Sequence, residues 1–178
     1  MVEIGDATVH IGKNMDTLKR LAEKSIQCCV TSPPYFGLRD YGIDGQLGLE
    51  PTPELFVQNL VEVFREVRRV LRDDGTLWLN LGDSYAANRS YQVNSTKGGP
   101  KHSSSQAAGG KGSSVPDGLK PKDLIGIPWM VAFALRADGW YLRSDIIWSK
   151  PNPMPESVTD RPTKAHEYMF GYSENRVE

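Results

Sequence analysis

The chain is organised around the segment Ile26-Gln27-Cys28-Cys29-Val30-Thr31-Ser32-Pro33-Pro34-Tyr35. Residues 26–30 form a short apolar run with β-branched residues and cysteines, a pattern typical of a buried strand. Two consecutive prolines follow, and neither can donate a hydrogen bond to a neighbouring strand, so the strand must end there. Ligands of open α/β sheets bind beyond the carboxyl ends of the strands, which places Ser32 and Tyr35 where a substrate would arrive.

The overall composition predicts one soluble domain. The chain has 178 residues, of which 39% are hydrophobic, enough to build one core. No apolar run reaches the roughly 20 residues that span a bilayer and no signal-peptide pattern is present, so we expect a cytoplasmic protein. The formal net charge is −1, which does not indicate general nucleic-acid binding. Cys28 and Cys29 are too few for a disulfide framework or a zinc site and are expected in the core.

Helical and strand patterns alternate along the chain, which predicts an α/β fold. The best helix start is Thr52-Pro53, with a capping hydroxyl and a proline in the first turn. We expect a surface loop over 36–51. The expected elements are a short strand or hairpin within 2–11 with Gly5-Asp6 at its turn, helices over 14–24, 53–71 and 124–138, and strands over 76–81, 140–148 and 164–172.

Residues 86–122 differ in composition from the rest of the chain. They are rich in Ser, Gly, Lys, Asn and Gln and contain almost no apolar residues, which predicts a flexible insertion within a single domain of residues 1–178. The insertion is the only strongly basic segment, with Arg89, Lys97, Lys101, Lys111, Lys120 and Lys122 set against Asp117. A functional segment and a solvated linker are equally compatible with this composition.

Ser32-Pro33-Pro34-Tyr35 resembles the catalytic Ser/Asp/Asn-Pro-Pro-Tyr/Phe motif of the DNA amino-methyltransferases of the permuted β group. These enzymes methylate an exocyclic nitrogen of cytosine or adenine with S-adenosylmethionine. Gly5-Asp6 resembles the acid-bearing turn that precedes the motif in this group. The segment from Asp145 to Asn152, with Arg161 and His166-Glu167, resembles the later Trp-x-Lys and His-Glu segment of the family.

The resemblance implies a Rossmann-like sheet with flanking helices, S-adenosylmethionine as cofactor, double-stranded DNA as partner, and a prokaryotic or phage-encoded restriction-modification gene. Ser32 Oγ and the Pro33 carbonyl would accept hydrogen bonds from the target amine, while the prolines fix the backbone and Tyr35 stacks on a flipped base. Asp6 would contact the cofactor, although an acid at a glycine turn also suits a purely structural role. No metal is expected.

The basic insertion offers candidate DNA contacts, namely Arg89, Lys97, Lys101 and Lys111, which would neutralise phosphates. Serine at the first motif position resembles the cytosine-N4 branch, and adenine-N6 is the alternative. His166-Glu167 suits either a supporting position beside the site or the surface.

The glycine-rich Phe-x-Gly-x-Gly loop that holds S-adenosylmethionine in this family is not found, so we expect a fold that is incomplete at its C-terminus. A missing C-terminal half or a second subunit would complete it. Two other hypotheses remain open. One is an inactive DNA-binding module with the same fold, and the other is an unrelated α/β nucleotide-binding protein, which the lack of a phosphate loop disfavours.

Overall fold

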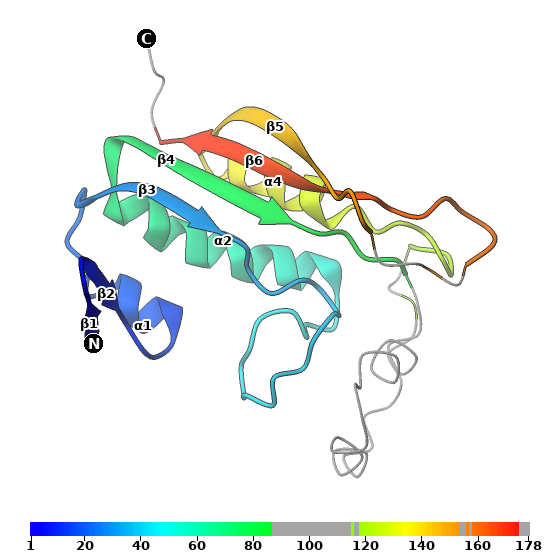
Figure 1. The fold of residues 1–178 in the computed structure, drawn as a ribbon, viewed down its shortest axis with the longest axis horizontal. Coiled ribbons are helices and arrows are strands. Elements are labelled where there is room, and N and C mark those ends of the chain that lie inside the picture. The colour runs from blue at the N-terminus through cyan, green and yellow to red at the C-terminus, as the bar shows by residue number, and fades with distance from the viewer. Residues whose placement is uncertain (87–114, 116–117, 154–155, 157, 175–178) are drawn as a thin grey trace.

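The computed structural model describes residues 1–86, 115, 118–153, 156 and 158–174, and it has the predicted mixed α/β architecture (Figure 1). A four-stranded sheet has the order β3-β4-β6-β5. Its strands are β3 (Ile26–Thr31), β4 (Leu71–Leu81), β5 (Tyr141–Ser149) and β6 (His166–Ser173). β3 and β4 are parallel, whereas β6 is antiparallel to both of its neighbours, so β5 runs in the same direction as β3 and β4.

Two helices cover one face of this sheet, α2 (Pro53–Val70) and α4 (Ile127–Ala137) (Figure 1). α2 begins as the sequence predicts, because the Thr52 hydroxyl accepts a hydrogen bond from the Leu55 N–H at 3.2 Å and Pro53 occupies the first turn. Pro128 likewise lies in the first turn of α4. N–H groups in the first turn have no partner within the helix, so a proline, which lacks this group, loses no hydrogen bond at the start of either helix.

The hydrophobic core lies between these helices and the sheet. Side chains alternate between the two faces of a strand, and β4 follows this rule with Leu77, Leu79 and Leu81 fully buried. Large buried side chains from the other elements complete the core: Phe56, Leu60 and Phe64 from α2, Ile127, Val131 and Leu135 from α4, Trp140, and Phe170 and Tyr172 from β6. The alternation leaves Trp78 and Asn80 on the opposite face of β4.

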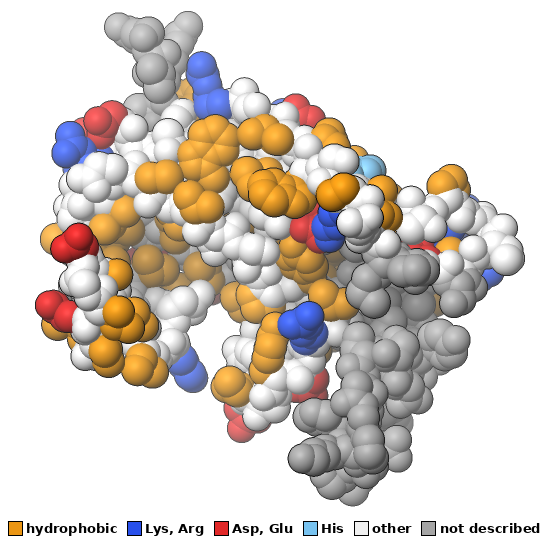
Figure 2. Space-filling view, viewed as in Figure 1, with side chains coloured by type: hydrophobic (Ala, Val, Ile, Leu, Met, Phe, Trp, Pro, Cys, Tyr) orange, Lys and Arg blue, Asp and Glu red, His pale blue; other side chains and the backbone are white. Residues whose placement is uncertain are grey.

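That opposite face is not covered by a helix of the described residues, and hydrophobic side chains gather on it (Figure 2). Among the described residues β3 lies at the edge of the sheet, and Val30 on it is 72% exposed. Cys28 is exposed and Cys29 is half-buried. The prediction of a buried strand at 26–30 is therefore wrong, because its continuous apolar run does not distinguish a central strand from an edge strand with one covered face.

The N-terminal residues form the predicted hairpin, in which β1 (Val2–Ile4) pairs only with β2 (Ala7–Val9) and Gly5-Asp6 makes the turn. The helix predicted over 14–24 is shorter. It is present as α1 (Asn14–Leu18), because the Leu18 carbonyl accepts a tighter bond from the Leu21 N–H, three residues on, and the Arg69 guanidinium donates to the carbonyls of Leu18 and Leu21. β4 begins at Leu71, earlier than predicted, because the Asp-Gly turn forms an irregularity within the strand.

The predicted basic insertion lies mostly outside the described residues, but its two ends are held together. The Ala86 N–H donates to the Asp123 carbonyl at 2.7 Å, and the Lys122 N–H donates to the Ala86 carbonyl at 2.7 Å. Ala86 and Lys122, the two ends of the predicted insertion, therefore lie side by side. In the part of the chain that the structure describes, no helix has the length and apolar character needed to cross a membrane.

The two faces of the sheet should differ in their contribution to stability. Leu79→Ala removes a side chain that is 0% exposed in the core and should lower the free energy of unfolding by about 2–5 kcal/mol. Val30→Ala, on the uncovered face, should change it by less than about 0.5 kcal/mol. Urea unfolding of this chain measures both, and equal losses would contradict burial of only one face.

Candidate active site

The motif Ser32-Pro33-Pro34-Tyr35 directly follows β3, at the carboxyl end of the parallel β3–β4 pair. A cavity of about 320 Å³ opens beside it, a volume at the lower end of the range for small-molecule sites. All four residues of the motif line this cavity. The remaining wall comes from the loop that follows the motif, with Leu38, Arg39 and Tyr41. The predicted strand end is thus also the wall of a ligand-sized cavity.

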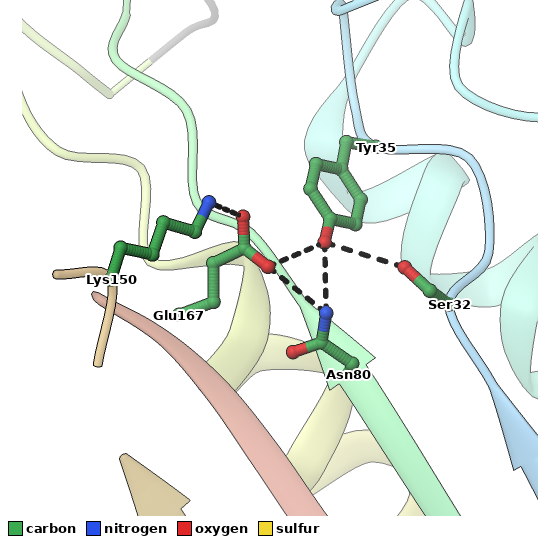
Figure 3. A network of polar contacts seen from close by, with 5 residues as sticks. All are labelled: Ser32, Tyr35, Asn80, Lys150 and Glu167. Atoms are coloured by element: carbon green, nitrogen blue, oxygen red, sulfur yellow. Dashed lines mark hydrogen bonds and ion pairs between the residues drawn. The ribbon is translucent and has the colours of Figure 1, made fainter. Parts of the chain in front are cut away.

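The phenol of Tyr35 is the centre of a polar cluster formed from separate parts of the chain (Figure 3). Its hydroxyl donates to Glu167 Oε2 on β6 at 2.9 Å and accepts from Asn80 Nδ2 on β4 at 3.1 Å. Ser32 Oγ donates to the same hydroxyl at 3.3 Å. The site therefore depends on β3, β4 and β6 being adjacent at this end of the sheet.

Glu167 accepts hydrogen bonds at both carboxylate oxygens. Oε2 accepts from Tyr35 and from Asn80 Nδ2, the latter at 2.9 Å, while Oε1 is paired with the Lys150 ammonium group. Burial is the largest single influence on the carboxyl group and opposes its ionisation. The hydrogen bonds from Lys150, Asn80 and Tyr35 together outweigh burial and lower the pKa of Glu167 below its ordinary value. Glu167 is therefore a carboxylate at neutral pH.

Tyr35 is held as a neutral phenol. Burial is the main cause that raises its pKa, and the neighbouring Glu167 carboxylate adds to this effect, whereas the hydrogen bond from Ser32 lowers the pKa. The ring lies against Gly82, where an added Cβ would come within 2.5 Å of the ring atom Cε2. Gly48 approaches the Tyr35 carbonyl almost as closely, since a Cβ there would lie 2.9 Å from that oxygen. Both glycines make room for the position of Tyr35.

Asp83 and Ser84, which follow β4, hydrogen-bond to the start of α4 and to the loop after the motif. Asp83 Oδ1 accepts hydrogen bonds from the backbone N–H groups of Ser84, Gly126 and Ile127, at 2.9, 3.0 and 3.0 Å, and so caps the start of α4. Ser84 Oγ donates to the Phe36 carbonyl at 2.8 Å and holds the loop after the motif. Both residues therefore have a structural role, and neither lines the cavity beside Tyr35.

Of the predicted site residues, Ser32, Pro33, Pro34 and Tyr35 lie together. Asp6 is exposed in the β1–β2 turn and does not line the cavity. The candidate DNA contacts Arg89, Lys97, Lys101 and Lys111 lie outside the described residues. Within the described residues, no group of three or more His, Cys, Asp or Glu side chains is arranged to hold a metal ion.

Asn80 and Lys150 are not among the predicted site residues, and the prediction for Glu167 is open between a supporting role and the surface. One signal was available for Asn80, because it is the one amide in the apolar run of residues 77–81 and so stands out in a strand. Lys150 and Glu167 lie in the segments that resemble the Trp-x-Lys and His-Glu segment of the family, but that resemblance gives them no partner, and a charged residue near a strand end is ordinarily solvated. Only the pairing of β4 with β6 brings them to Tyr35.

Comparison with known proteins finds a match over most of the chain. A family model described as DNA methylase, of the N6/N4 type, matches residues 26–178. The type II methyltransferase M.Cfr9I of Citrobacter freundii is 54% identical over 170 residues, which cover 95% of this chain and 55% of the relative. M.SmaI of Serratia marcescens is 50% identical over 169 residues, covering 94% and 56% respectively. This chain thus spans about half the length of these curated relatives.

Solved structures show the same fold. A protein of Thermus thermophilus that is assigned as a DNA modification methylase, and was crystallised with S-adenosyl-L-methionine, matches with a TM-score of 0.60 and 22% identity over 94% of this chain and 53% of that chain. The cytosine-N4-specific PvuII DNA methyltransferase matches with a TM-score of 0.60 and 17% identity over 93% and 48%. At these identities the likeness establishes the fold alone.

The cluster around Glu167 should make stability depend on pH. Because its pKa is lower in the folded protein than the ordinary value of 4.5, ionised Glu167 stabilises the fold above pH 4.5, and this contribution is lost as the pH falls through the lowered pKa. Glu167→Gln should therefore destabilise the protein at neutral pH and cost progressively less on acidification. Urea unfolding at several pH values measures the difference.

Glu3→Gln is a matched control, because it removes an exposed carboxylate on β1, outside the cluster. At neutral pH it should change the unfolding free energy by less than about 0.5 kcal/mol. A pH-independent effect of Glu167→Gln would show that the carboxylate is not held by these bonds.

Proposed function

The chain belongs to the N6/N4 DNA methylase family, and on that premise we propose that it forms the target-base pocket of a DNA amino-methyltransferase. The proposed reaction transfers a methyl group from S-adenosylmethionine to the exocyclic N4 of a cytosine flipped out of double-stranded DNA. One observation carries the proposal: Ser32-Pro33-Pro34-Tyr35 lines a cavity of about 320 Å³ at the carboxyl end of two parallel strands.

The residues of the motif suit the activation of an exocyclic amine. The lone pair of such an amine is delocalised into the ring, so the nitrogen is a weak nucleophile. Hydrogen-bond acceptors at its two N–H groups localise the lone pair and stabilise the positive charge that develops as the methyl group arrives. Ser32 Oγ and the Pro33 carbonyl are these acceptors. The methylated nitrogen then releases one proton to water.

S-adenosylmethionine, when bound, supplies an electrophilic methyl group whose carbon–sulfur bond breaks with its electron pair remaining on sulfur. Asp6 lines neither the cavity beside Tyr35 nor the larger cavity of about 750 Å³ on the other side of Pro34. A contact between Asp6 and the cofactor stays a prediction.

The choice of cytosine over adenine is part of the proposal. It is supported by serine at the first motif position, which resembles the cytosine-N4 branch. The type II naming of the relatives supports a role in restriction-modification. Adenine-N6 is the alternative product, because acceptors and a stacking surface can receive either base.

Recognition of DNA requires positive charge near the pocket. Arg39 lines the cavity, where its charge favours the phosphate of the flipped nucleotide. Contacts from Arg89, Lys97, Lys101 and Lys111 stay predictions.

Methyl transfer from isotope-labelled S-adenosylmethionine to duplex DNA tests the function directly, with the full-length protein. Mass spectrometry of the nucleosides should find N4-methylcytosine, whereas N6-methyladenine would establish the alternative. Ser32→Ala should lower the rate about a hundredfold or more, because it removes a preorganised acceptor. An absence of transfer together with retained DNA binding would favour an inactive DNA-binding module, and an unchanged rate in Ser32→Ala would exclude the role of Ser32.

Stacking on Tyr35 can be tested without the cofactor. Tyr35→Ala should weaken binding to DNA that contains an unpaired target base by about 1–3 kcal/mol, the usual contribution of one base–aromatic stack. Tyr35→Phe keeps the ring and should bind as tightly as the unsubstituted protein. Tyr141→Ala, at the far end of β5, is the surface control. Equal affinity of the Tyr35→Ala and control proteins would contradict stacking.

A further inference from the structure

We propose that Glu167, acting through Tyr35, orients the Ser32 hydroxyl so that its lone pairs face the target amine. In this relay the Ser32 O–H donates to Tyr35, and the Tyr35 O–H donates to Glu167 (Figure 3). The inference rests on the proposed function, because it explains how the neutral Ser32 hydroxyl can only accept a hydrogen bond from the target amine. Glu167 is a positioning residue in this scheme and does not touch the base.

The direction of each bond follows from counting protons. The Glu167 carboxylate has no proton, so the Tyr35 hydroxyl, 2.9 Å from Oε2, must donate to it. A phenol has only one proton to donate, and Asn80 already donates to the Tyr35 oxygen from the other side. The remaining contact, between Ser32 and Tyr35, must therefore use the proton of Ser32.

The amide of Asn80 supports this direction. Its nitrogen lies 3.1 Å from the Tyr35 oxygen and 2.9 Å from Glu167 Oε2. An amide oxygen in that position would be repelled by the carboxylate, so Nδ2 must face both groups. Asn80 thereby occupies an acceptor site of Tyr35 and prevents the phenol from rotating away from Glu167.

The orientation matters because a free serine hydroxyl can turn either its proton or a lone pair toward a ligand. The target amine presents only N–H groups to its acceptors, so a hydroxyl proton that pointed at it would oppose binding. With its proton directed to Tyr35, Ser32 offers lone pairs alone, as a carboxylate would. The Ser32–Tyr35 contact of 3.3 Å is long for an O–H donor, and such contacts often shorten when a substrate binds.

The relay orients Ser32 and does not remove the proton of the amine. The pKa of Glu167 is held low by Lys150 and the other hydrogen-bond donors, which makes its carboxylate a weak base. The pKa of Tyr35 is raised, mainly by burial, so the phenol keeps its own proton. Lys150, paired with Glu167 Oε1, leaves Oε2 as the oxygen that faces Tyr35.

The direction of the relay can be measured without cofactor or DNA. In the protein labelled with ¹³C at tyrosine Cζ, the Tyr35 signal is identified by its loss in Tyr35→Phe, and its titration gives the pKa. Removing a donor to the phenolate, as in Ser32→Ala, should raise the pKa of Tyr35. Removing the carboxylate, as in Glu167→Gln, should lower it. Ser144→Ala, an exposed serine on β5, is the control and should leave it unchanged.

The contribution to methyl transfer can be measured by a double-mutant cycle in the full-length protein. Glu167→Gln should lower kcat about tenfold, the effect of one net hydrogen bond, with little change in KM for DNA. In the Ser32→Asp background the acceptor carries no proton and needs no orientation, so the same substitution should cost less than about twofold. In the Tyr35→Phe background the relay is already broken, so Glu167→Gln should cause little further loss of kcat.

These outcomes separate the relay from the proposed function. A decrease in the pKa of Tyr35 in Ser32→Ala, or no change, would overturn the relay whether or not the protein is an enzyme. Equal losses of kcat from Glu167→Gln in the Ser32 and Ser32→Asp backgrounds would also overturn it. If the unsubstituted protein transfers no methyl group, the proposed function fails, while the tyrosine titration still decides the direction of the bonds.

Discussion

The alternation of side chains along β4 is the constraint on which this structure depends. Three leucines at every second position face the helices and form the centre of the core. The same pleat directs Asn80 to the opposite face, beside the end of β3. A shift of one residue in the pairing would place an amide in the core and the leucines in solvent, so packing of the core also positions a polar residue of the site.

The sheet topology brings the functional groups together because β6 is inserted between β4 and β5. Its pairing with β4 brings Glu167 to the same end of the sheet as the motif that follows β3, within hydrogen-bond distance of Tyr35. Lys150 follows β5, and its ammonium group reaches Glu167 from the other side. A carboxylate that is partly buried against tyrosine and asparagine would be destabilising alone, and the lysine and the two other donors offset that cost.

Much of the fold could be predicted from local patterns. The capping hydroxyl and proline at Thr52-Pro53 predict the start of α2, because these residues act on the backbone within one turn. The prediction of a buried strand at 26–30 was wrong for a non-local reason. Whether a strand is central or at an edge depends on its neighbours in the sheet, which the apolar run of β3 does not specify.

The position of the motif Ser32-Pro33-Pro34-Tyr35 relative to its strand follows from the sequence alone, because two consecutive prolines cannot donate a hydrogen bond to a strand on either side. The hydrogen-bond partners of Tyr35, in contrast, depend on the tertiary structure. Asn80 and Glu167 lie 87 residues apart in the chain, and a hydrogen bond between them requires the β4–β6 pairing. Hydrogen bonds act over about 3 Å, so their partners are set by the arrangement of the strands and not by the spacing in the sequence.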